Sequence, residues 1–166
     1  MTKQLPHNEI VNSINKKEII VITDNIRTPE NVGMLFRVSE AFGVTKVILI
    51  GESPDLTNNK VKRTARSAEK GLNLSFNQNS REVIQSLKEN NFYLIGLEIT
   101  NNSSLLKTFN FSEYKKIALF IGNERNGIDS KILNELDTIL HFELFGKNSS
   151  INVINALTVG LYEILR

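Results

Sequence analysis

The 166-residue sequence contains no cysteine and no tryptophan, and it has only three prolines, two methionines and two histidines. The lack of cysteine excludes disulfides, thiolate metal sites and a cysteine nucleophile. The two histidines, His7 and His141, are far apart in the sequence, so we expect surface or edge residues rather than ligands. We therefore predict no metal site.

Long hydrophobic runs are also missing. No apolar stretch approaches the roughly 18 residues that a membrane-spanning helix requires, and residues 1–10 contain no hydrophobic signal core. We expect a cytoplasmic protein without a membrane partner. An apolar share of 40% and a charged share of 23% are ordinary for a globular chain, and 166 residues suffice for one domain with its own core.

The sequence has little excess charge of either sign, because its net charge is only +2. Between residues 60 and 70, however, a single acid, Glu69, accompanies a basic strip of five side chains: Lys60, Lys62, Arg63, Arg66 and Lys70. Such a run is either a solvated charged face or a surface that contacts phosphates. Composition alone leaves both interpretations open.

Hydrophobic periodicity predicts a single α/β domain over residues 1–166. Apolar or β-branched runs predict strands at 18–23, 46–50, 73–77, 92–99, 116–121 and 138–142. Helical spacing predicts helices at 1–17, 29–42, 81–90, 130–136 and 153–165. The alternation of strands and helices is typical of a mostly parallel sheet with helices on both faces, preceded by a short N-terminal helical extension.

A first polar cluster lies on the predicted helix at 29–42, where Thr28 is a candidate capping residue. Asn31, Gly33 and Arg37 form this cluster, and Gly33 and Arg37 share one helix face. A glycine inside a helix costs about 1 kcal/mol relative to alanine. Either a close helix contact requires Gly33, or Gly33 leaves room for a substrate beside Arg37, whose guanidinium binds phosphate or ribose.

Two further clusters directly follow predicted strands, where ligands bind in open parallel sheets. The run at 122–127 (GNERNG) is neither a P-loop nor a GxGxxG motif. Its Asn126-Gly127 pair is also typical of a plain hairpin turn. The run at 146–152 (GKNSSIN) precedes the last helix, and capping explains one of its two residues Ser150 and Asn152.

Together these clusters resemble the SpoU/TrmH family of RNA ribose 2'-O-methyltransferases in the SPOUT superfamily. The resemblance covers about residues 18–165. It rests on three motifs, formed by Asn31, Val32, Gly33 and Arg37, by Gly122, Glu124 and Gly127, and by Gly146, Ser150, Ile151, Asn152 and Ala156. Two departures stand out: Glu143-Leu144 replaces the usual proline and methionine, and Ile154-Asn155 replaces serine and valine.

The resemblance implies a deep C-terminal trefoil knot and S-adenosylmethionine as methyl donor. Backbone groups of Gly122, Phe142, Leu144 and Ile151 would hold the donor, with Leu97 as a further wall. It also implies a homodimer, whose candidate interface elements are the helices at 31–42 and 153–165. We expect no metal cofactor.

The family's catalytic positions correspond to Arg37, Asn31, Glu124, Ser150 and Asn152. A guanidinium stays protonated, so we assign Arg37 to orienting the ribose and a phosphate rather than to removing a proton. Because the sequence shows no appended RNA-binding domain, we expect RNA to bind Lys60, Lys62, Arg63 and Arg66.

Transfer RNA is the preferred substrate by analogy with compact members of the family. The alternatives are ribosomal RNA, a catalytically silent RNA-binding relative, methylation of a base, and methylation of a small molecule.

Overall fold

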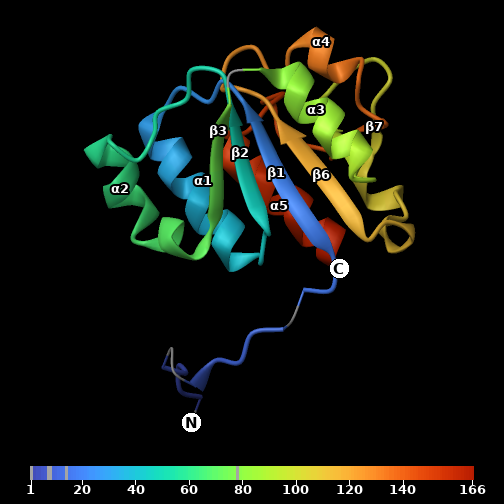
Figure 1. The fold of residues 1–166 in the computed structure, drawn as a ribbon. Helices are drawn as coiled ribbons and strands as arrows, with labels where there is room; N and C mark the ends of the chain where they lie inside the picture. The colour runs from blue at the N-terminus through green and yellow to red at the C-terminus, as the bar shows by residue number, and fades with distance from the viewer. Residues whose placement is uncertain (1, 7–8, 14, 78) are drawn as a thin grey trace.

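A computed structural model describes residues 2–6, 9–13, 15–77 and 79–166. Its strands form one sheet in the order β3-β2-β1-β6-β4-β7-β5, and each neighbouring pair runs parallel (Figure 1). The strands are β1 (Glu18–Asp24), β2 (Lys46–Ile50), β3 (Asn73–Asn77), β4 (Tyr93–Leu97), β5 (Ser104–Leu105), β6 (Lys116–Ile121) and β7 (Thr138–His141).

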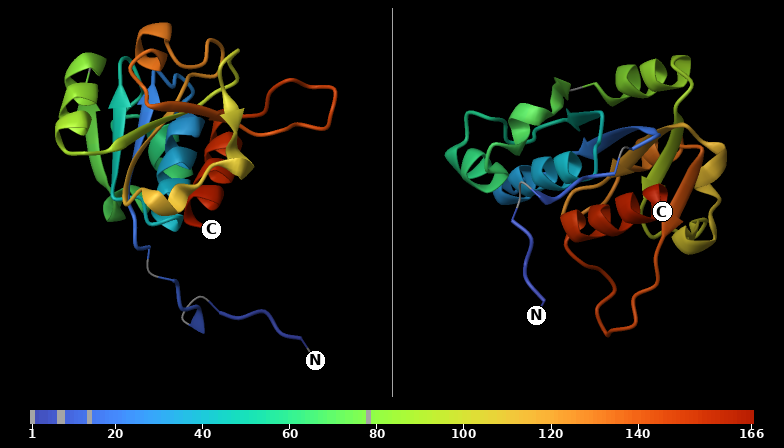
Figure 2. Two further views of the ribbon diagram at one scale, coloured as in Figure 1. Left: turned by 90° about the vertical axis from the view of Figure 1, so that its right-hand side faces the viewer. Right: turned by 90° about the horizontal axis from the view of Figure 1, so that it is seen from below.

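Helices cover both faces of this sheet. The α-helices are α1 (Pro29–Ala41), α2 (Asn59–Ala65), α3 (Ser80–Glu89), α4 (Ser130–Leu133) and α5 (Val153–Leu165). Short 3-10 helices are η2 (Ala68–Gly71), η3 (Leu106–Thr108) and η4 (Phe111–Glu113). Helices α1 and α5 pack on one face, and α3 and α4 pack on the other (Figures 1 and 2).

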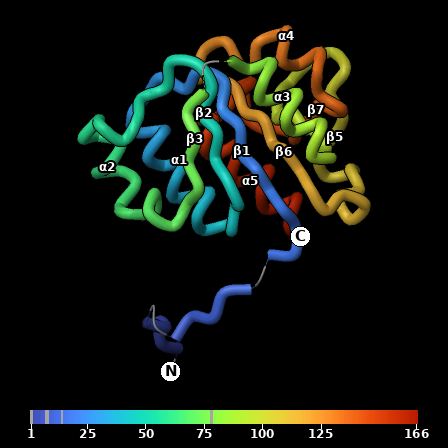
Figure 3. Tube along the Cα trace, viewed as in Figure 1, coloured from blue at the N-terminus to red at the C-terminus, as the bar shows by residue number. Residues whose placement is uncertain are grey.

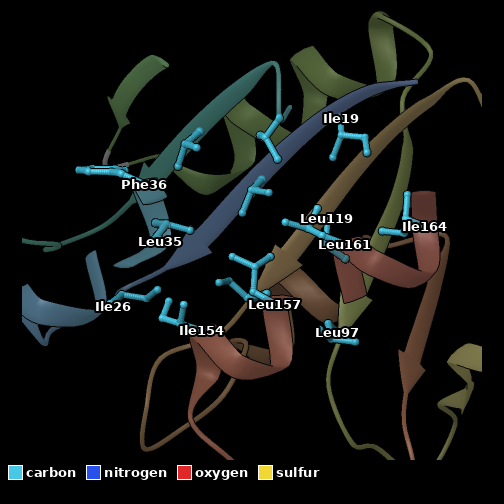
Figure 4. Packing of buried hydrophobic residues seen from close by; sticks show 14 of the residues in the cluster. Ile19, Ile26, Leu35, Phe36, Leu97, Leu119, Ile154, Leu157, Leu161 and Ile164 are labelled. Atoms are coloured by element: carbon cyan, nitrogen blue, oxygen red, sulfur yellow. The ribbon is translucent and has the colours of Figure 1, made fainter. Parts of the chain in front are cut away.

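Alternate residues of each central strand point to opposite faces of the sheet, and each face carries one half of the hydrophobic core. On β1, Ile19 and Val21 pack with α1 and α5, whereas Ile20 and Ile22 face α3 and α4. Figure 4 shows Leu157, Leu161 and Ile164 of α5 in the half of the core that α1 and α5 cover. Each large apolar side chain buried in this way contributes about 1.5–3 kcal/mol. Burial on both faces explains why the strands are continuous apolar runs in the sequence.

The predicted mostly parallel sheet with helices on both faces and the predicted strands are confirmed, with differences in detail. The two-residue edge strand β5, in the polar connection before β6, was not predicted. The predicted helix at 130–136 ends at Leu133. The basic strip folds into α2 and η2, for which no element was predicted.

The predicted N-terminal helix is wrong for the described residues. Residues 2–6, 9–13 and 15–17 contain no α-helix, and their trace runs away from the sheet (Figure 3). Ile10 and Val11 are 50% and 94% exposed, so no packing surface supports a helix that is marginal by itself. The prediction for His7 lies outside the described residues, as do residues 1, 7–8 and 14 of the predicted helix.

Candidate active site

The turn after β6 places the second motif at the carboxyl ends of the strands. Asn123 and Gly127 exchange two backbone hydrogen bonds, with N to O distances of 3.1 and 3.3 Å. Gly127 adopts a φ of 66°, which favours glycine, and a Cβ on Gly122 would overlap the backbone of Gly127. Residues 123–127 thus form a turn closed by an isolated bridge, and α4 at Ser130, rather than the second strand of a hairpin, follows it.

A cavity of about 290 Å³ lies beside this turn. It is lined by every residue predicted to bind the cofactor, namely Leu97, Gly122, Phe142, Leu144 and Ile151. The predicted catalytic residues Glu124, Ser150 and Asn152 line it as well. Segments from β4, β6 and β7 and from the start of α5 thus meet at one site.

Several residues of this cavity were not predicted from the sequence. Among them are Glu98, Ile99 and His141, which lie at or directly after the carboxyl ends of β4 and β7. In the sequence they stand next to the predicted cofactor residues Leu97 and Phe142, and this proximity could have indicated that they line the same site. The prediction of a surface or edge position for His141 is wrong, because this residue is half-buried in a strand that β4 and β5 flank.

Glu124 joins the three motifs through side-chain hydrogen bonds. Its carboxylate accepts from the backbone amides of Arg27 and Thr28, at 3.2 and 3.0 Å, and from Nδ2 of Asn31, at 2.8 Å. Oδ1 of Asn31 in turn accepts from Nδ2 of Asn152, at 3.1 Å. Glu124 therefore holds the segment that leads into α1, where the Thr28 side chain makes no capping hydrogen bond.

These hydrogen bonds keep Glu124 ionised. Partial desolvation raises the pKa of its carboxyl, but the donors, with Asn31 foremost, outweigh this effect and lower the pKa to about 2. Glu124 is therefore a fixed anion at neutral pH. Its acceptor sites are directed at α1, and a carboxylate with so low a pKa is a poor proton acceptor.

Asn152 has a structural task in addition to its bond with Asn31. Its Oδ1 accepts from the backbone amide of Ile154, at 2.8 Å, and caps α5. Capping therefore explains Asn152, whereas Ser150 lines the cavity from the exposed loop that projects before α5 (Figure 2). Of the family departures, Glu143 pairs with Lys107 of η3, and Leu144 contributes to the cavity wall.

Arg37 lies outside the cavity within one chain. Its side chain is exposed on α1, with Nη1 4.0 Å from the sulfur of Met34. Gly33 is buried where α2 crosses α1, and a Cβ there would lie 2.6 Å from the Val61 carbonyl oxygen and 2.7 Å from Cβ of Thr64. The close helix contact, rather than room for a substrate, therefore accounts for Gly33.

The predicted RNA-binding side chains Lys60, Lys62, Arg63 and Arg66 are all exposed on or next to α2. Lys60 forms an ion pair with Glu30 of α1, at 3.5 Å. The contact at Gly33 therefore places this basic surface beside α1, the helix that carries Arg37.

Two absences apply to the described part of the chain. It contains no group of three His, Cys, Asp or Glu residues arranged to hold a metal ion. It also contains no helix of the length and apolarity needed to span a membrane.

Comparison with known proteins identifies the family. The model of the SpoU rRNA Methylase family matches residues 18–162, which include the three motifs. The chain belongs to the SpoU rRNA methylase family. This SpoU chain is 25% identical to 23S rRNA (guanosine(2553)-2'-O)-methyltransferase RlmP of Bacillus subtilis (strain 168). The aligned 145 residues cover 87% of this chain and 57% of RlmP.

Solved SpoU-like structures share the fold. The AdoMet-bound rRNA methyltransferase from Sinorhizobium meliloti superposes with a TM-score of 0.83 and 22% identity, covering 91% of this chain and 57% of that one. A structure described as giving insights into the 2-OH methylation of C/U34 on tRNA has a TM-score of 0.80 and 19% identity, with coverage of 90% and 95%. The SpoU chain thus spans little more than half of RlmP and of the Sinorhizobium protein, but nearly all of the third.

Proposed function

We propose that this protein transfers a methyl group from S-adenosylmethionine to a ribose 2'-oxygen of RNA. The observation that carries the proposal is the chain of hydrogen bonds from Glu124 through Asn31 to Asn152. It unites the three family motifs at the rim of the cavity that the predicted cofactor residues line.

The lining of the cavity suits the methyl donor in chemistry. Leu97, Phe142 and Ile151 offer apolar walls for an aromatic base, and Gly122 contributes backbone to the same lining. When bound, S-adenosylmethionine supplies an electrophilic methyl group on a positively charged sulfur. The protein's own contribution is mainly to hold the acceptor hydroxyl in line with that group.

We assign Arg37 to the acceptor side of the reaction. Its guanidinium stays protonated, so it orients the ribose and an adjacent phosphate rather than accepting the hydroxyl proton. Because Arg37 is outside the cavity of its own chain, the assignment requires a second contact surface, and we propose a homodimer. Met34 of α1 and Val159 and Tyr162 of α5 are 37%, 37% and 61% exposed apolar side chains, and the two helices contact each other.

We propose transfer RNA as the substrate, with ribosomal RNA as the alternative. The basic strip gives a phosphate-binding surface next to α1, which favours RNA over a small molecule. The structure concerned with 2-OH methylation of C/U34 on tRNA supports tRNA, because this chain covers 95% of that protein. RlmP, by contrast, is a longer protein that is named for 23S rRNA.

We also propose the trefoil knot that the resemblance implies. The chain has α4 on one face of the sheet and α5 on the other, and the segment from β7 to α5 lines the same cavity as the turn at 122–127. Single-molecule stretching tests this threading, because an unfolded chain that retains a tightened knot has a shorter contour length than an untied one.

A methylation assay tests the activity. Radiolabelled S-adenosylmethionine is incubated with the protein and either unmodified tRNA or ribosomal RNA, and the labelled RNA is then hydrolysed in alkali. We expect label in an alkali-resistant dinucleotide from tRNA, because a 2'-O-methyl group blocks cleavage at that position. Label in single nucleotides would indicate base methylation, and donor binding by calorimetry without label transfer would identify a silent relative.

A further inference from the structure

We infer that Glu98 is the residue by which the cavity recognises the positive charge of the methyl donor, and that it also fastens the Gly122–Gly127 turn to β4. The inference rests on the proposed function, because it concerns the same cavity. Glu98 belongs to none of the three motifs, and it lies where β4 ends, beside the predicted wall residue Leu97.

Both carboxylate oxygens of Glu98 are held in place. Oε2 accepts from the backbone amide of Ile128, at 3.2 Å, and Oε1 accepts from the amide of Ile99, at 2.9 Å. Ile128 directly follows the turn that closes at Gly127, so the first bond ties this turn to the end of β4. A carboxylate oxygen has about two acceptor positions, so each oxygen retains one for a ligand.

The Glu98 carboxylate occupies the position where any other residue at 127 would carry its Cβ. A Cβ on Gly127 would collide with Oε2 of Glu98 and would lie 3.0 Å from its Cδ. The left-handed backbone of Gly127 and the absence of a side chain thus let the half-buried carboxylate lie directly against the turn.

The charges around the cavity leave Glu98 as the available anion. Four ionisable side chains line it, namely Glu98, Glu124, Arg125 and His141. Glu124 uses three of its roughly four acceptor positions on Arg27, Thr28 and Asn31, whereas Glu98 uses two of its four. Glu98 is half-buried, and a charge in that setting interacts more strongly with a bound cation than a fully solvated one does.

This charge would favour exchange of product for substrate. Methyl transfer breaks the carbon–sulfur bond with its electron pair left on sulfur, forms a carbon–oxygen bond, and releases the hydroxyl proton to solvent. The product, S-adenosylhomocysteine, is a neutral thioether and lacks the attraction to Glu98. The carboxylate therefore stabilises the bound donor more than the bound product.

Calorimetry with both ligands tests this role. For the wild type and Glu98→Gln, the Kd of S-adenosylmethionine and the Kd of S-adenosylhomocysteine are measured in the same low-salt buffer. We expect the preference for the donor over the product to fall by at least about threefold in Glu98→Gln, because the charge is removed while the side-chain size is kept. Glu98→Asp should retain more of the preference, since it keeps the charge.

Glu89→Gln is the matched control. It changes the net charge equally, but Glu89 is exposed on α3, at the amino end of β4. The control should keep the wild-type preference. If Glu98→Gln weakens both ligands by the same factor, Glu98 does not distinguish the sulfonium charge and the proposed charge recognition is refuted.

A wild-type protein that binds neither ligand would refute the proposed function itself. The fastening role has a separate readout, because Glu98→Gln places an amide against backbone donors and should lower the melting temperature of the ligand-free protein. An unchanged melting temperature would contradict the fastening role.

Discussion

Asn152 donates a hydrogen bond from Nδ2 to Oδ1 of Asn31 over 3.1 Å, although 121 positions separate the two residues in the sequence. Asn31 lies in the first turn of α1, and Asn152 caps α5. One amide pair thus connects the starts of the two helices that cover the same face of the sheet. Because Asn31 also donates to Glu124, a change at any of the three residues should affect the other two.

Asn152→Ala should reduce both stability and methyl transfer. The loss of a helix cap costs about 0.5–2 kcal/mol, and the loss of the bond to Asn31 frees the Glu124 network. Asn79→Ala is the control, since Asn79 caps α3 by accepting a similar 3.1 Å bond from the amide of Arg81. Thermal melts and methylation rates of both variants should show comparable destabilisation, but a strong loss of rate only for Asn152→Ala. Equal rates would argue against a catalytic role of the network.

The low pKa of Glu124 predicts a pH-dependent contribution to stability. A carboxyl whose pKa falls from 4.5 to about 2 on folding stabilises the protein above pH 4.5, and this contribution disappears as the pH drops toward about 2. Because the side chain is partly exposed, we expect screening to limit the effect to about 1 kcal/mol. Chemical denaturation of the wild type and Glu124→Gln should differ at pH 7 and converge near pH 2. A difference that is independent of pH would contradict the assignment.

Gly33→Ala should force α1 and α2 apart. The new Cβ would meet backbone atoms of α2, and overpacking of this kind costs about 1–3 kcal/mol. Gly146→Ala is a suitable control, because a Cβ at Gly146 has no atom within 4 Å. Urea denaturation should show a lower midpoint for Gly33→Ala alone, and filter binding should show weaker RNA affinity. Undiminished stability of Gly33→Ala would indicate that the helices adapt to the larger side chain.

Arg37→Ala should abolish methyl transfer and leave binding of S-adenosylmethionine intact. If the proposed dimer directs Arg37 into the partner's cavity, mixing Arg37→Ala with Glu124→Gln creates mixed dimers in which one of two sites is fully wild type. Random exchange of subunits would then restore about a quarter of the activity. No recovery in a mixture with proven subunit exchange would mean that Arg37 serves its own chain.

Lys62→Ala and Arg63→Ala should weaken RNA binding by an electrostatic effect. Both side chains are exposed on α2. Each lost phosphate contact should reduce the slope of log Kd against log salt concentration by about 0.7–0.9. Arg81→Ala, an exposed charge on α3, is the control and should leave the slope unchanged. A slope that stays constant in Arg63→Ala and Lys62→Ala would place the RNA elsewhere.

Local patterns in the sequence were sufficient for most of the fold. Strands buried on both faces need continuous apolar runs, and helices need a repeating apolar stripe, so β1, β6 and α5 are visible without coordinates. The motif at 122–127 could likewise be placed at a strand end. The N-terminal prediction failed because the spacing of Ile10 and Val11 cannot show whether a packing surface exists for them.

The sequence by itself determined the parallel α/β class, the family and the motif residues that line the cavity, because these depend on local patterns and on the order of the motifs. Only the tertiary structure decided how the side chains are used. It showed that Gly33 serves a helix contact, that Glu124 is engaged with the start of α1, and that Glu98 lies against Gly127. Such contacts join residues that are remote in the chain, and their geometry exists only once the strands have set the distances between them.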